Sequence, residues 1–196
     1  TPKGRLKPSS TDDSNISAHL GYQAGKHYIA AKAQRYDVAA KMYWQQDGFA
    51  TDLPKRELNK VGLFYQGDQL TDTLDKLKID VYRQTVDRIF DNDVTVRTPK
   101  ITRNINSLSD DEQITYGLNT QAELSLIDGH STVVGFEYEQ DRLKASKIRL
   151  VTLTPLPPLS SPAEYSYDDA SIDTVSIFAQ HTVPLAEDLT ASFGAR

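Results

Sequence analysis

The sequence predicts an all-β fold of antiparallel up-and-down strands, about eight strands of a larger transmembrane β-barrel. Two observations predict it. Short turns alternate with long polar loops, which we expect near residues 37–56, 89–110 and 145–169, and membrane-spanning barrels have tight turns at one rim and long loops at the other. Apolar and polar residues also alternate, over about 13 residues in the clearest case, whereas globular strands average about 5–6.

The first four strands form two hairpins. They are expected at residues 15–23, 27–36, 57–66 and 75–88. A turn at 24–26 (AGK) joins the first pair, and a turn within 67–75 joins the second. In the third strand, Val61, Leu63 and Tyr65 fall on one face because strand side chains alternate between faces.

The last four strands continue the pattern. They are expected at residues 114–126, 130–144, 171–183 and 188–196, with turns at 127–129 and 184–188. The fifth strand is the most regular, and only Thr120 interrupts its apolar face. Residues 152–162 are expected to form an extended loop, because proline cannot donate a ladder hydrogen bond. Residues 91–93 and 104–111 have the composition of loops.

Each expected strand has one apolar and one polar face, which leaves two arrangements open. If the apolar face packs on a protein core, the polar face meets bulk water. If it meets lipid, the polar face lines a lumen. Periodicity does not separate the two, but strand length and the sorting of the connections favour lipid.

The composition narrows the class of protein. The chain has 196 residues, a net charge of −5 and no cysteine. Without a basic patch, a nucleic-acid partner is not expected. No apolar run approaches the roughly 20 residues of a membrane helix. The chain starts at Thr1 and stops in mid-pattern at Arg196, so we expect it to be a piece of a longer protein.

Several segments together resemble one family. SIFAQH at 176–181 followed by LTASFGAR at 189–196 is similar to the mid-barrel hairpin of TonB-dependent outer-membrane receptors. Further support comes from QRYD at 34–37, YRQT at 82–85, TYGLN at 115–119 and GFEY at 135–138. These resemble the middle strands of receptors for haem, haem proteins and ferric siderophores.

The resemblance implies a bacterial outer-membrane barrel of 22 strands, closed by a separate plug domain. Residues 1–196 would be a mid-barrel fragment, with the plug and the remaining strands outside this segment. The receptor would bind an iron carrier outside the cell and release it to the periplasm when TonB pulls on the plug. The implied partners are TonB, the iron-carrier ligand and outer-membrane lipids.

Candidate binding residues are aromatic or basic side chains of the expected long loops. The candidates are Tyr43, Trp44, Tyr165, Tyr167, Arg97 and Arg103. Aromatic rings offer flat contact area to haem or aryl siderophores, and arginine attracts anionic groups. The alternative reading is an interfacial aromatic girdle and ordinary charge balance.

A second candidate group faces the expected lumen. Glu137 and Glu139 alternate along one strand face, and we expect them to pair with arginines of the plug or of neighbouring strands. Arg196, at the Gly-x-Arg position of the resembled family, is one such partner. We expect no catalytic residue, metal site or resident cofactor, because no nucleophile, phosphate-binding or His-x-x-x-His motif occurs.

The sequence therefore favours a receptor that binds and actively imports an iron complex, either haem or a ferric siderophore. Two alternatives remain. A passive porin-like barrel shares the fold but lacks a plug. A soluble all-β ligand-binding module would bury the apolar faces against each other. We do not expect an enzyme.

Overall fold

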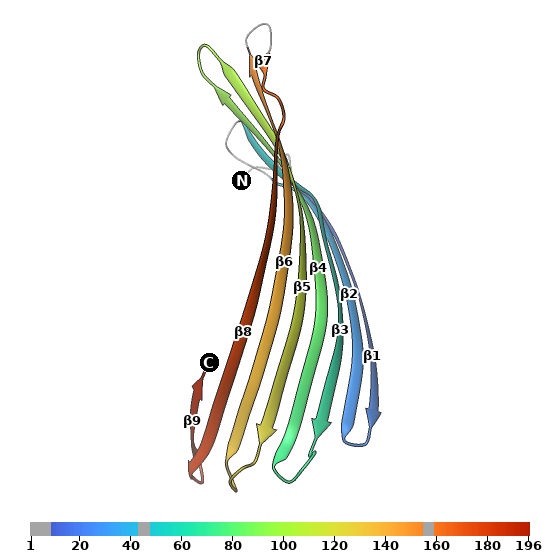
Figure 1. The fold of residues 1–196 in the computed structure, drawn as a ribbon, viewed down its shortest axis with the longest axis vertical. Coiled ribbons are helices and arrows are strands. Elements are labelled where there is room, and N and C mark those ends of the chain that lie inside the picture. Colours follow the sequence, from blue (N-terminus) through green and yellow to red (C-terminus); the bar gives the residue numbers. More distant parts are fainter. Residues whose placement is uncertain (1–8, 43–47, 155–158) are drawn as a thin grey trace, which may run out of the picture.

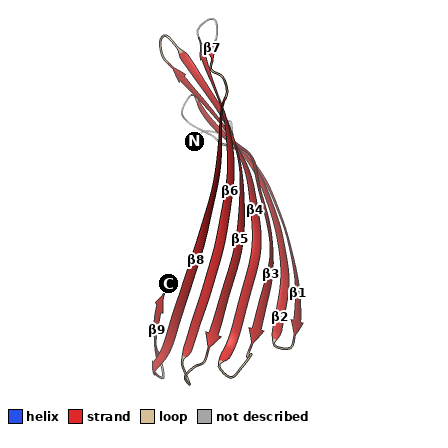
Figure 2. Ribbon diagram, viewed as in Figure 1, coloured by secondary structure: helices blue, strands red, loops and turns tan. Residues whose placement is uncertain are grey.

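The computed structural model describes residues 9–42, 48–154 and 159–196, which form one curved sheet (Figure 1). The strands are β1 (Ser10–Ala24), β2 (His27–Lys41), β3 (Phe49–Asp68), β4 (Leu74–Arg97), β5 (Thr102–Leu124), β6 (Ser131–Thr154), β7 (Leu159–Ser160), β8 (Glu164–Ala186) and β9 (Leu189–Ala195). This described part of the chain contains no helix (Figure 2). The prediction of an all-β fold is confirmed.

The strands follow one another in chain order, each antiparallel to the next, so the predicted up-and-down topology is confirmed as well. Only the two-residue strand β7 lies off this path, beside β6. The predicted short turns all lie at the same end of the sheet (Figure 1). Gly25 and Gly129 adopt positive φ angles of 56° and 73° in two of these turns, a conformation that costs glycine little.

The long polar loops are the part of the prediction that is wrong. Residues 91–93 belong to β4, 104–111 to β5, 152–154 to β6 and 164–169 to β8. The connection between β4 and β5 shrinks to residues 98–101. Polar composition indicated loops, but the backbone of these residues pairs with the neighbouring strand, and some of their polar side chains form hydrogen bonds across it. Asn106, for example, donates a hydrogen bond of 2.7 Å to Asp93.

Register is continuous over most of the sheet, so the two faces stay distinct along whole strands. The β4–β5 and β5–β6 ladders are uninterrupted over residues 76–97, 102–124 and 132–154. Bulges occur beside Val38 in the β2–β3 ladder and between Asp52 and Lys55 in the β3–β4 ladder. The second bulge contains Pro54, which has no N–H for the ladder.

The sheet is a single layer. Each strand contacts only its neighbours in the sheet, and within the described residues only two apolar residues, Ala30 and Val151, are buried. No second layer of the described chain covers Leu118 or Phe136. This arrangement does not match a soluble sandwich, which would bury its apolar faces against each other. No helix of the described residues is long and apolar enough to cross a membrane.

Candidate ligand-binding face

Cross-strand pairing gathers the apolar residues on one face, which we call the apolar face. One row across the sheet joins Leu20, Ala31, Leu63, Val81, Leu118, Tyr138 and Val175. With the neighbouring rows it forms an apolar band between the turns and the middle of the strands. Many of its side chains are strongly exposed, with Leu20 at 78% and Ile177 at 70%, whereas Leu118 and Tyr138 are half-buried between their neighbours. So large an exposed apolar surface marks contact with lipid or another protein.

The opposite side, which we call the polar face, is lined by charged residues, aromatic rings and glycines. A Cβ at Gly117 would overlap the ring of Tyr82, and a Cβ at Gly135 would overlap the ring of Phe178. These glycines therefore let the rings lie flat on the neighbouring strand. The Tyr82 hydroxyl then reaches across β5 and donates a hydrogen bond of 2.7 Å to Glu139.

The predicted partners Glu137 and Arg196 meet on this polar face. The Arg196 guanidinium donates a hydrogen bond to the Glu137 carboxylate and forms an ion pair with it. Glu139 lies two residues further along β6, on the same face, and accepts the hydrogen bond from Tyr82. Glu137 and Glu139 therefore both form hydrogen bonds with residues from other parts of the described sheet.

Farther from the turns, the polar face becomes basic. Arg56 of β3 and Arg88 of β4 are directly opposite each other in the ladder. Arg88 donates hydrogen bonds of 3.2 and 2.5 Å to Asp111 and lies 4.9 Å above the Phe90 ring. Arg56 is exposed and forms no ion pair with any described residue. Like charges placed directly opposite each other are destabilising, so this pair favours a negatively charged partner.

We call this basic part of the polar face the polar wall. Between β3 and β8 its charged residues are Arg56, Arg88, Arg103, Lys147 and Arg149 with Asp111, Glu164 and Asp168. Five positive side chains therefore face three negative ones. Two pairs among them are ion pairs, Arg88 with Asp111 at 2.5 Å and Arg149 with Glu164 at 3.5 Å.

In the same part of the sheet, behind the polar wall, the apolar face carries a net negative charge. Its acidic residues there are Asp52, Glu57, Asp87, Asp91, Asp93, Asp110, Glu112 and Asp169, against Lys55, Arg97, Arg142 and Lys144. On the adjoining strand, two hydrogen bonds from the Arg35 guanidinium hold the pKa of Asp37 below its usual value. At this distance from the turns, the two faces of the sheet therefore carry net charges of opposite sign. Only the polar wall is suited to anions.

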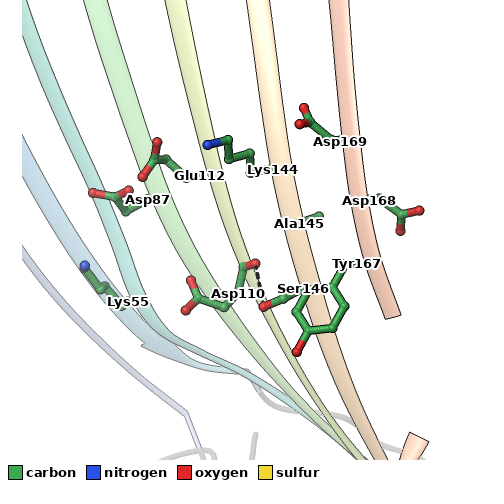
Figure 3. A pocket seen from close by; sticks show the side chains of 10 residues that line it. All are labelled: Lys55, Asp87, Asp110, Glu112, Lys144, Ala145, Ser146, Tyr167, Asp168 and Asp169. Atoms are coloured by element: carbon green, nitrogen blue, oxygen red, sulfur yellow. Dashed lines mark hydrogen bonds between the residues drawn. The ribbon is translucent and has the colours of Figure 1, made fainter. Parts of the chain in front are cut away.

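One hollow lies among these acidic residues. It has a volume of about 620 Å³ and is open, and Figure 3 shows carboxylates and two lysines around it. Most of its lining, including Asp87, Glu112 and Tyr167, shares the apolar face by register. Ser146 donates a hydrogen bond of 3.4 Å to the Asp110 carbonyl across it (Figure 3). We do not assign it as the ligand site, because it opens away from the polar wall.

The structure separates the predicted binding residues instead of gathering them. Tyr165 and Tyr167 lie in β8, not in a loop, and share the apolar face because they pair with Ile148 and Ser146. Arg97 ends β4 on that same face, whereas Arg103 lies on the polar wall of β5. Tyr43 and Trp44 lie outside the described residues.

Two features escaped the sequence analysis. Arg56 fell in a predicted loop, although the alternation of β3 continues through it to the bulge. His130 and His181 make a ring contact although 51 residues separate them, with 3.2 Å between Nδ1 of His130 and Nε2 of His181. Only the register of β6 on β8 brings the two rings together, and no local spacing signals it.

Comparison with known protein families shows to which family this sheet belongs. The family model for the TonB-dependent receptor-like β-barrel matches residues 5–196. The chain belongs to the TonB-dependent receptor family. Proteins of this family are receptors and transporters of the bacterial outer membrane, not enzymes. This agrees with the expected location and with the expectation that the chain is not an enzyme. No curated protein matches the chain by sequence.

Solved structures of the family share the fold. The ferric yersiniabactin uptake receptor FyuA of Yersinia pestis aligns with a TM-score of 0.53 and 14% identity, over 95% of this chain. The RagAB peptide importer in its open-open state aligns with a TM-score of 0.52 and 10% identity, over 94% of this chain. This receptor chain spans 27% of the length of either protein, as expected for part of a larger barrel.

Proposed function

We propose that this chain is part of the barrel wall of an outer-membrane receptor that binds and actively imports an iron complex, haem or a ferric siderophore. In this proposal the apolar band contacts lipid and the polar face lines the lumen. The plug domain and the remaining strands belong to segments outside residues 1–196. TonB is the proposed energy-coupling partner, because family membership implies it.

The observation that carries the choice of cargo is the charge of the polar wall. Arg56 and Arg88 are adjacent, and only Arg88 has an ion-pair partner among the described residues. Siderophore carboxylates, catecholates and haem propionates are anionic and accept charge-assisted hydrogen bonds from arginine. The fold alone names no cargo, because FyuA is a ferric yersiniabactin receptor whereas RagAB imports peptides.

Two neighbouring residues provide a matched test of the polar wall. Arg56→Gln removes a positive charge from the polar face, whereas Lys55→Gln removes one from the apolar face at the same level. Losing one charge-assisted hydrogen bond costs about 1.5 kcal/mol, so we expect Arg56→Gln to raise the Kd of the full-length receptor for its anionic iron complex about tenfold. Lys55→Gln should leave the Kd within about twofold.

The measurement is a titration of the purified receptor in detergent with haem and a panel of ferric siderophores. Equal affinities of the two variants for every bound complex would contradict an anionic site at the polar wall. Growth under iron starvation tests the transport step. A deletion strain should lose growth on one iron complex, and import of that complex that persists without TonB would identify a passive barrel instead.

A further inference from the structure

Two histidines from different hairpins meet near the turns of the sheet. His130 precedes β6, His181 lies in β8, and both share the apolar face because Thr132 pairs with His181. The rings are tilted by 46° with centroids 5.3 Å apart, and Nδ1 of His130 lies 3.2 Å from Nε2 of His181. Both side chains are half-buried. They lie on the turn side of the apolar band, where water reaches them.

A third side chain sets the orientation of His181. The Thr132 hydroxyl lies 2.8 Å from Nδ1 of His181. When the hydroxyl accepts the Nδ1 proton, the Nε2 lone pair of His181 accepts the hydrogen bond from Nδ1 of His130, which a bound metal ion would replace. Metal-binding histidines typically have this arrangement, in which the nitrogen away from the metal donates to an oxygen that fixes the tautomer.

The spacing also fits a metal ion held by both rings. Two imidazole nitrogens bound at about 2.0–2.1 Å with a tetrahedral angle lie roughly 3.3 Å apart, close to the observed 3.2 Å. We propose that His130 and His181 form a binding site for a divalent first-row transition metal such as Cu²⁺, Ni²⁺ or Zn²⁺. Within the described residues no group of three or more candidate ligands gathers, so water completes the coordination.

Binding requires one rearrangement of protons. Nδ1 of His130 must lose its proton before it can bind a metal ion. That proton moves through solvent to Nε2 of the same ring. No net proton is released when both rings are neutral. Imidazole ligands favour Cu²⁺ over Ni²⁺ and Zn²⁺ in the usual affinity order, so Cu²⁺ is the most sensitive probe. The site is independent of the polar wall and of the cargo proposed above.

The test titrates the full-length receptor in detergent with Cu²⁺ and with Zn²⁺. We expect His130→Ala and His181→Ala each to bind one equivalent of metal less than the wild type, or to bind that equivalent with at least tenfold lower affinity. The double variant His19→Ala/His27→Ala removes two imidazoles from two other strands and should retain that equivalent. Heat-modifiable migration on gels verifies that every variant is folded.

Two further readouts distinguish ligation from a structural role. Electron paramagnetic resonance of the Cu²⁺-loaded receptor should show coupling to two nitrogens at this site, and one nitrogen after His181→Ala. Thr132→Val keeps the shape of the side chain but removes the oxygen that orients His181. It should lower the affinity for the metal about tenfold. A wild-type receptor that binds no more metal than His130→Ala or His181→Ala would overturn the proposal.

Discussion

Glycine and aromatic residues form a recurring pair on the polar face. Tyr82 covers Gly117, and Phe178 covers Gly135, each across one strand boundary. The flat ring reaches a carboxylate that an upright ring would miss, as Tyr82 does with Glu139. Such pairs also hold the rings against the sheet, which keeps the polar face open.

Gly117→Ala is expected to destabilise the receptor by about 1–3 kcal/mol, because the new methyl group forces the Tyr82 ring off the strand. Urea unfolding of the full-length protein in lipid vesicles measures the change. Gly194→Ala serves as the control, since its Cβ would lie 3.4 Å from the nearest atom, an ordinary contact. If Gly117→Ala unfolds at the same urea concentration as the wild type, the proposed packing is wrong.

Strands are longer here than the sequence indicates. Alternation of apolar and polar residues marks only the part of each strand that carries the apolar band. Beyond the band both faces carry many charged, amide and hydroxyl side chains, so parts of β4, β5, β6 and β8 look like loops residue by residue. They remain strands because each backbone finds its hydrogen-bond partners on the neighbouring strand, which outweighs weak local preferences.

Consecutive residues of β5 test the assignment of its faces. Leu118→Arg puts a charge into the apolar band, and we expect a loss of about 2–4 kcal/mol of folding free energy in a bilayer. Asn119→Arg puts the same charge on the polar face and should change that free energy by less than about 1 kcal/mol. Equal effects of both substitutions on folding into vesicles would mean that the apolar band does not meet hydrocarbon.

The whole sheet leaves both of its edges open. β1 and β9 each pair with one strand only, and many side chains of the apolar band are exposed. Unpaired edges and a wet apolar surface promote association with other chains. A complete barrel removes both problems, because closure pairs the edges and lipid covers the band.

These 196 residues expressed by themselves are therefore expected to associate or to require detergent. Light scattering after size-exclusion chromatography, run with and without detergent, measures this. A monodisperse monomer in plain buffer that retains its β-sheet circular dichroism would contradict the lipid-facing assignment. The full-length receptor should be monodisperse in detergent.

The sequence alone determined the order of the strands, the short turns and the faces of the apolar band. These features depend on residues near one another in the chain, such as Gly25 in its turn and the alternation around Leu118. The tertiary structure decided how far each strand extends and which side chains meet across it. Arg56 beside Arg88, and His130 beside His181, exist only because of strand register, which is a property of paired backbones rather than of any single segment.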